Sequence, residues 1–240
     1  MSKPTTLYCF SPPVMIATFV IEASLFVYTV VRYRLAPVGR IVAAMLACLA
    51  IFQLAEYNVC GHDLMPAGWS RVGYVAITLL PALGVHLVQA IAGRRAWLSL
   101  IGAYGSSAAF ALIFGLNSAA FQGHVCGGNY AVFQLMSPLG GVYFFYYYFW
   151  LFIGIAMAWM YSRTAKPNIR KAQLLQILGY FSFIIPTSVV NAINPQTLDG
   201  IPSIMCGFAV TYALILSFGV VPLVSPQHTQ ATKRHSGHKL

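Results

Sequence analysis

Seven long apolar stretches, separated by short polar segments, dominate the pattern of hydrophobic and polar positions along this chain. The length of each stretch is close to that of a membrane-spanning α-helix, which needs about 20 residues to cross the hydrocarbon core of a bilayer. The apolar residues are continuous rather than alternating, which favours helices over the strands of a membrane β-barrel. We therefore predict an all-α membrane protein, a seven-transmembrane helix bundle with spans at 13–33, 39–60, 70–93, 97–117, 138–161, 172–194 and 200–224.

These spans divide the chain into three parts. We expect an external N-terminal segment at 1–12, a seven-helix transmembrane domain at 13–224 and a disordered basic cytoplasmic tail at 225–240. The first apolar run is long enough to span, and no basic region precedes it that would hold its start inside the cell. It is therefore interpreted as a membrane helix rather than a removable signal peptide.

Composition supports the same class of protein. Hydrophobic residues make up 59% of the 240 residues, charged residues make up 8%, and the mean hydropathy is +0.73. A soluble domain of this size would need more charge to cover its surface, so the lipid bilayer is the expected partner.

The net charge of +10 sets the orientation rather than indicating nucleic acid. Twelve of the 14 Lys and Arg residues lie in alternate loops and in the tail, and the exceptions are Lys3 and Arg71. Basic loops stay cytoplasmic, so the N-terminus is expected outside and the C-terminus inside. We expect a multi-pass protein of the cell membrane, with a bacterial inner membrane favoured, and no nucleic-acid partner.

A few polar residues interrupt the apolar spans and are the candidates for function. Glu22 lies near the middle of its span, where an ionised carboxylate costs at least ~2.5 kcal/mol. It should therefore face the bundle and be protonated or paired. Gln53 and Glu56 are one turn apart on one helix face. For Glu56, nearer the outer interface, a hydrated carboxylate is the alternative interpretation.

Most of these residues lie between the midplane and the outer face, which suggests a cavity open to the outside. Its ligand would be small and lipophilic or cationic. Interhelical hydrogen bonding and aromatic packing are the alternative roles for these side chains. Ligand binding would act through helix kinks expected at Pro81 and Pro186. The candidate ligand-binding residues are Glu22, Gln53, Glu56, His86, Tyr143, Tyr147 and Asn191.

Four of the five cysteines lie at or near the external ends of spans, where an oxidising compartment allows two disulfides. We favour the pairs Cys60 with Cys126 and Cys9 with Cys206 among three possible connectivities. A metal site at the first pair is the less favoured alternative, because its ligand spacing matches no familiar zinc motif. Its further ligands would be His62, Asp63 and His124.

The absence of several motifs argues against an enzyme and against a cofactor. Every lysine lies outside the spans, so none is placed to form a retinal Schiff base. One histidine lies inside a span, too few for a transmembrane bis-histidine haem within this chain. The sequence also contains no HExxH, GxSxG or phosphate-binding glycine loop.

The order of features resembles the N-terminal seven-helix sensor module of some bacterial histidine kinases. The resemblance is carried by FQLAEY at 52–57, by RVGYVAITLLPALGVHLV at 71–88 and by the basic loop before the span at 172–194. It implies a sensory role. Since no kinase domain follows Val224, it implies a stand-alone relative that signals to a separate membrane or cytoplasmic protein.

Three functions are compatible with this pattern. The first is a receptor-like sensor that binds a small ligand in an outward-facing cavity. The second is an accessory structural subunit of a larger membrane complex, packing through its small-residue and aromatic helix faces. The third is a proton-coupled transporter in which Glu22 titrates during the cycle.

Overall fold

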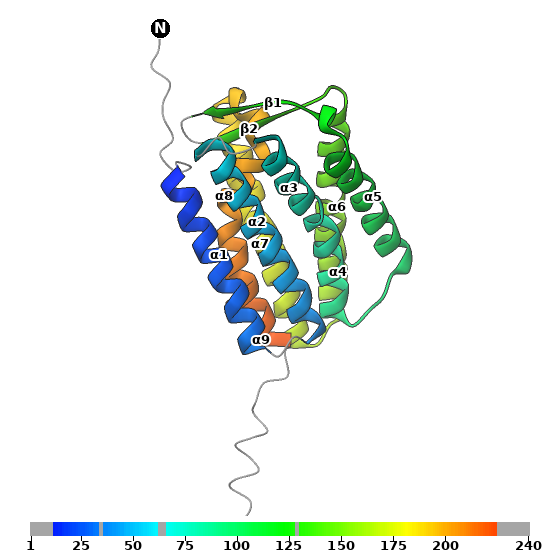
Figure 1. Ribbon diagram of the computed structural model, residues 1–240. Coiled ribbons are helices and arrows are strands. Elements are labelled where there is room, and N and C mark those ends of the chain that lie inside the picture. Colours follow the sequence, from blue (N-terminus) through cyan, green and yellow to red (C-terminus); the bar gives the residue numbers. More distant parts are fainter. Residues whose placement is uncertain (1–11, 34–35, 62–65, 128–129, 225–240) are drawn as a thin grey trace, which may run out of the picture.

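The computed structural model describes residues 12–33, 36–61, 66–127 and 130–224. Seven of its helical segments are long and apolar enough to cross a membrane, and they form an up-and-down bundle (Figure 1). This confirms the predicted fold class. The expected N-terminal segment, apart from Pro12, and the expected tail lie outside the described residues. The helices are α1 (Pro12–Arg32), α2 (Pro37–Gly61), α3 (Pro66–Thr78), α4 (Leu80–Ala92), α5 (Trp97–Leu116), α6 (Leu139–Ser162), α7 (Pro167–Ile193) and α8 (Ile201–Leu214), and α8 continues through a π-helical turn (Ile215–Val220) into α9 (Val221–Val224).

Helix α1 shows how sequence sets the packing. Its buried residues recur every three or four positions, as one face of a helix requires. The helix packs along α2 and also against α8, and its other face is exposed. Glu22 therefore lies in the middle of the buried stripe, as predicted. The stripe consists of Met15, Thr18, Glu22, Leu25 and Thr29.

The third span is interrupted between α3 and α4, two residues before Pro81. Proline has no N–H to donate along the helix, so the backbone carbonyls of the preceding turn need other partners. The carbonyl of Thr78 accepts hydrogen bonds from Tyr146 Oη at 2.7 Å and Ser107 Oγ at 3.1 Å. The interruption is thus stabilised by hydroxyls from α5 and α6. Helix α7, in contrast, stays continuous through Pro186.

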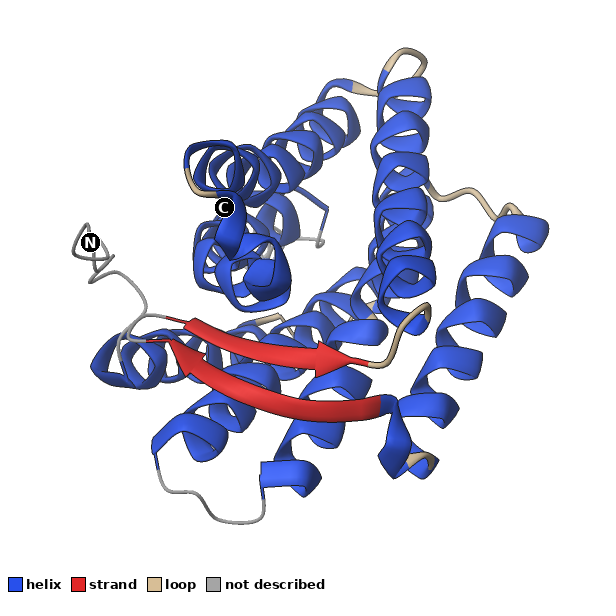
Figure 2. Ribbon diagram, turned by 90° about the horizontal axis from the view of Figure 1, so that it is seen from above, coloured by secondary structure: helices blue, strands red, loops and turns tan. Residues whose placement is uncertain are grey.

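A β-hairpin covers one end of the bundle, and the sequence analysis did not predict it. Strands β1 (Phe121–Gly127) and β2 (Tyr130–Leu135) pair antiparallel and lie across the ends of the helices (Figure 2). Phe133 of β2 is buried and packs against Tyr74 and Phe52, with ring centroids 5.3 and 6.1 Å apart. The hairpin therefore closes the aromatic core of the bundle.

A disulfide between Cys60 at the end of α2 and Cys126 in β1 fastens the hairpin to the helices. The Cα atoms are 5.6 Å apart, an ordinary separation for a disulfide. This confirms the first predicted pair. The second prediction is wrong, because Cys206 is a buried free thiol that faces the helix core; Cys9 lies outside the described residues.

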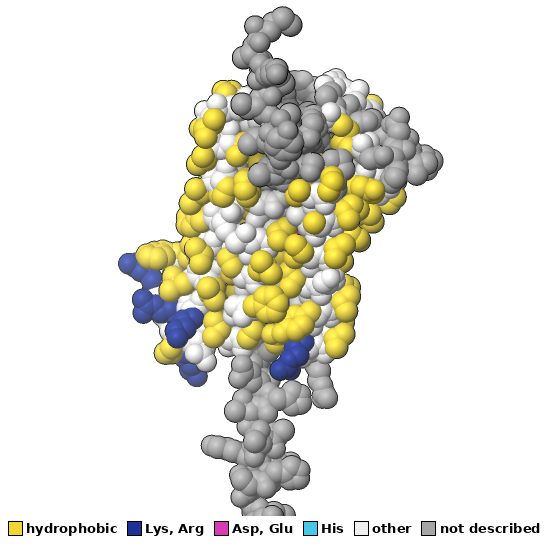
Figure 3. All heavy atoms as spheres, turned by 90° about the vertical axis from the view of Figure 1, so that its left-hand side faces the viewer, with side chains coloured by type: hydrophobic (Ala, Val, Ile, Leu, Met, Phe, Trp, Pro, Cys, Tyr) yellow, Lys and Arg dark blue, Asp and Glu magenta, His cyan; other side chains and the backbone are white. Residues whose placement is uncertain are grey.

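The surface has the two zones that a bilayer imposes. On the face in Figure 3 a hydrophobic band covers the middle of the molecule, and Lys and Arg side chains gather near the lower end. That lower end contains the α1–α2, α4–α5 and α6–α7 connections. We call it the basic end, and we call the opposite end the hairpin end. The positive-inside rule predicts that the basic end faces the cytoplasm.

Candidate functional site

The strongest candidate site is a pair of buried carboxyl groups, Glu22 on α1 and Glu56 on α2. Their side chains are 0% and 1% exposed, and they are close enough for direct charge–charge interaction. Glu22 lies ten residues from either end of α1, which at 1.5 Å per residue is about 15 Å. The alternative interpretation of Glu56 as a hydrated, interfacial carboxylate is wrong, because packing under the hairpin end removes this side chain from solvent.

The hydrogen bonding of the pair is incomplete. Ser203 near the start of α8 hydrogen-bonds the Glu56 carboxyl, while Glu56 Oε1 has no hydrogen-bond partner among the described residues. Within the same part of the chain, both carboxyl oxygens of Glu22 and Nε2 of Gln53 also have none. A buried polar group without a partner costs about 1–3 kcal/mol. Sequence reasoning had overlooked Ser203, whose only signal was a hydroxyl near the outer end of a span.

The junction of α1, α2 and α8 is therefore a site of unused hydrogen-bonding capacity. Gln53 lies one turn before Glu56 on the same face of α2, and both side chains are buried. The Cys206 thiol lies within electrostatic range of both glutamates. Chemically, the junction offers several acceptors and one amide donor, which suits a cation or a ligand rich in N–H groups.

Tyr143 and Tyr147 belong to a neighbouring cavity. It lies among α3, α6 and α8, is lined by both tyrosines together with Ile77, Met205 and Cys206, and has a volume of about 20 Å³. That is room for about one water molecule rather than an organic ligand. Tyr143 Oη also accepts a hydrogen bond from Thr78 Oγ1 at 3.2 Å, and the Tyr143 ring packs edge-on against Phe114 with ring centroids 5.0 Å apart. Tyr143 therefore contributes mainly to the packing of the aromatic core.

The two remaining predicted residues lie elsewhere. Asn191, near the end of α7, accepts a hydrogen bond from Thr197 Oγ1 at 2.7 Å and so holds the connection to α8. His86 on α4 contacts Tyr104 Oη through Nδ1 at 2.9 Å and lines a groove at the basic end. The structure thus brings together the Glu22 and Glu56 carboxyls, and separately the two tyrosines, but not all seven residues around one cavity.

The metal alternative has little support in the structure. His62 and Asp63 lie outside the described residues, as does the side chain of His124. The sulfurs of Cys60 and Cys126 form the disulfide, and a disulfide sulfur is not a thiolate ligand. In the ranges that the structure describes, no group of three or more His, Cys, Asp or Glu side chains is placed to hold a metal.

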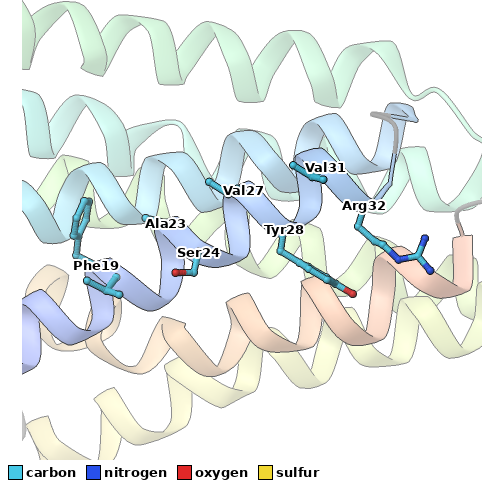
Figure 4. Close-up of a pocket in the computed structure, with 8 residues that line it drawn as sticks. Phe19, Ala23, Ser24, Val27, Tyr28, Val31 and Arg32 are labelled. Carbon is cyan, nitrogen blue, oxygen red and sulfur yellow. The ribbon is translucent and has the colours of Figure 1, made fainter.

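The outer face of α1 is a different kind of surface. An open groove of about 830 Å³ runs along this helix (Figure 4), and its walls are mostly apolar. Ser24 lies midway along it and Arg32 at its basic end. This face lies where lipid chains surround the bundle, on the side of α1 away from its buried stripe.

Fold and site together define a multi-pass membrane protein of seven apolar helices with a buried acidic pair at the junction of α1, α2 and α8. No protein-family model matches the sequence, and a search of the curated proteins finds no significant match. Function must therefore be argued from the site.

Proposed function

We propose that this protein is a receptor-like membrane sensor that binds a small cationic ligand at Glu22 and Glu56 and signals to a separate protein partner. One observation carries the proposal: the Glu22 carboxyl is fully buried in mid-span, has no hydrogen-bond partner among the described residues, and lies within range of charge–charge interaction with the Glu56 carboxyl. Ionisable groups in such positions are costly and usually functional. A cation between the two carboxyls would supply the missing partner.

Access to the pair requires movement of one peripheral helix. The buried face of α1 contacts α2 and α8, while its opposite face lines the open groove in Figure 4. A tilt of α1 would open the carboxyl pair without disturbing the aromatic core around Tyr74 and Tyr143. A bound cation would then favour the closed arrangement, because it contacts α1 and α2 together only in that state.

The same helix provides a route to the basic end. Directly after α1, Tyr33 Oη donates a 3.4 Å hydrogen bond to the carbonyl of Ser217, which belongs to the π-helical turn before α9. Such turns often occur at functional sites. A tilt of α1 would shift this contact and the basic α1–α2 connection, where a cytoplasmic partner could respond.

The sensor proposal also agrees with the resemblance to the sensor modules of histidine kinases. The proposed setting is a bacterial inner membrane with the hairpin end in the periplasm. An oxidising compartment at that end would suit the Cys60–Cys126 disulfide.

Thermal denaturation of the purified full chain in mild detergent tests the proposal. The probes are tetramethylammonium, ethylammonium and phenethylammonium chlorides, with sodium chloride as the ionic-strength control. A probe present at 100 times its Kd stabilises the folded state by about 2.7 kcal/mol. We expect at least one organic cation to raise the melting temperature of the wild type but not of Glu22→Gln or Glu56→Gln.

The matched control is Asp199→Asn, which removes one negative charge from the short helix Pro195–Gly200 outside the spans. It should respond to the cation as the wild type does. The proposal is refuted if no probe shifts the wild type, or if both Gln variants keep the full shift.

A proton-coupled carrier is the second candidate, favoured by the mid-span position of Glu22 and its lack of a partner among the described residues. In this mechanism the carboxyl would exchange a proton in each transport cycle. Proteoliposomes with an imposed pH gradient should then show proton flux that Glu22→Gln abolishes. Flux that Glu22→Gln leaves unchanged would remove this candidate.

A further inference from the structure

A second candidate binding site lies at the basic end of the bundle, far from the acidic pair. It is a groove of about 680 Å³ between the start of α2, the end of α4 and the start of α5. We call it the basic groove; its polar lining includes His86, Gln89, Arg94, Arg95 and Tyr104. The inference about this groove does not depend on the proposed sensor function.

Among the described residues, the charge of the groove has no acidic counterpart at the basic end of the bundle. The four acidic residues of the whole sequence are Glu22, Glu56, Asp63 and Asp199. Glu22 lies in the middle of α1, Glu56 lies in the half of α2 that leads to the hairpin end, and Asp199 belongs to the short helix Pro195–Gly200 that follows α7. Asp63 lies outside the described residues. Arg94 and Arg95 are exposed at the mouth of the groove. Charge complementarity therefore favours an anionic ligand in this groove.

The buried side chain of Gln89 fixes the turn between α4 and α5 that carries these arginines. Gln89 is 1% exposed; its Oε1 accepts the Ala96 N–H at 2.8 Å, and its Nε2 donates to Ser99 Oγ at 2.8 Å. Gly93 ends α4 in the left-handed conformation with φ of 63°, which glycine adopts without a steric penalty. A buried amide thus holds the positions of both arginines, so less entropy is lost when they bind.

Aromatic rings hold the two guanidinium groups near the membrane interface. Arg94 lies over the ring of Tyr161, with Cζ 5.4 Å from the centroid, and Arg95 lies over Trp97 at 5.7 Å. Tyrosine and tryptophan are typical of headgroup depth. The guanidinium groups are therefore placed where phosphate groups of the leaflet occur.

The inner part of the groove changes character with depth. His86 and Tyr104, joined by their 2.9 Å contact, lie about 12 Å along the helix axis from Arg94. Ile41 and Ile101 add apolar walls, and the Ile101 side chain is exposed to the surrounding lipid. The groove therefore offers positive charge at its mouth, polar groups below and apolar surface towards the bilayer core.

We propose that the basic groove binds one anionic phospholipid of the cytoplasmic leaflet. Its phosphate lies against Arg94 and Arg95, its glycerol ester region against Tyr104 and His86, and an acyl chain along Ile101.

Native mass spectrometry of the full chain in detergent tests this site, with palmitoyl-oleoyl phosphatidylglycerol, palmitoyl-oleoyl phosphatidylcholine and inorganic phosphate as probes. We expect one phosphatidylglycerol to be retained about 30-fold more tightly than phosphatidylcholine, as two arginines near the surface predict. The double variant Arg94→Gln, Arg95→Gln should lose this preference. Inorganic phosphate at millimolar concentration should not displace the lipid, because it lacks the acyl chain.

Two further variants separate the groove from general surface charge. Arg163→Gln is the matched control: this exposed arginine also lies at the basic end over an aromatic ring, Trp159, at 5.9 Å, and its loss should leave lipid retention unchanged. Ile101→Trp narrows the groove at its apolar wall and keeps both arginines. Position 101 is exposed and should tolerate the larger side chain. Retention of phosphatidylglycerol should fall in this variant.

Four outcomes would overturn the inference. Equal retention of phosphatidylcholine would remove the role of the arginines. A loss of retention in Arg163→Gln as large as in the double variant would assign the effect to the general charge of the surface. Full retention in Ile101→Trp would show that the lipid does not enter the groove, and displacement by phosphate would identify a simple anion site.

Discussion

Replacing Glu22 by methionine should make this protein more stable, although the substitution removes the central residue of the proposed site. Both carboxyl oxygens are buried without a hydrogen-bond partner among the described residues. Methionine has a similar length, no group that needs a partner, and enough flexibility to fill the space. Relief of the buried polar group should raise the free energy of unfolding by about 1–3 kcal/mol. For a chain of this length that is about 2–12 °C in melting temperature.

The equivalent change at Glu56 provides an internal comparison. Glu56 accepts a hydrogen bond from Ser203, so Glu56→Met relieves one oxygen without a partner and also removes an acceptor that is in use. Breaking such a bond costs about 0.5–1.5 kcal/mol, which offsets the gain. We therefore expect Glu22→Met to melt at a clearly higher temperature than Glu56→Met, and Glu56→Met to stay within about 3 °C of the wild type.

The assay is thermal denaturation of each variant in the same detergent, followed by tryptophan fluorescence and checked by size-exclusion chromatography. A melting temperature of Glu22→Met well below that of the wild type would mean that the carboxyl has a favourable partner, and the reasoning about this site would fail. Equal gains in the two variants would contradict the difference in their hydrogen bonding. A stabilised Glu22→Met that no longer responds to the organic cation would show the trade of stability for function expected at a binding site.

Two further predictions concern the scaffold. Cys126→Ser opens a disulfide that joins residues 66 apart and should cost about 4 kcal/mol by the chain-entropy argument; adding reductant to the wild type should reproduce the loss, and a loss unrelated to reduction would contradict it. Gly179→Ala places a Cβ 2.7 Å from Cε2 of the buried Tyr212 and should destabilise the fold by about 1–3 kcal/mol. The control is Gly105→Ala, whose Cβ meets nothing within 4 Å and which should melt at or above the wild-type temperature. Similar melting temperatures of the two variants would refute the close packing of Tyr212 on Gly179.

The number, approximate position and length of the spans could be predicted from the sequence. Bilayer thickness imposes a length on each apolar run, and that length is visible locally. The largest difference is at α7, which begins at Pro167 rather than near 172. Proline at the first position starts the helix, and Arg170 and Lys171 extend it beyond the apolar core.

The hairpin carried a local signal that sequence reasoning did not use. Residues 121–135 include a Gly-Gly pair between two short runs with aromatic and β-branched residues, which is typical of a hairpin turn. The segment lies outside the apolar spans, and its only candidate residues in the sequence analysis are His124 and Cys126. Its effect on the site is large, because it helps to close the hairpin end over Tyr74 and brings Cys126 to Cys60.

The sequence by itself determined that seven apolar helices cross a bilayer, that positive charge gathers at one end, and that Glu22 must turn inward. Each of these follows from a cost that acts on a residue at its own depth, whatever its neighbours are. The tertiary structure decided which side chains interact: Glu22 with Glu56 through charge, Ser203 with Glu56 through a hydrogen bond, and Cys206 with the helix core rather than with a second cysteine. Such pairings depend on the rotation of each helix about its axis and on the packing of helices far apart in sequence. Neither can be read from the depth of a residue in the membrane.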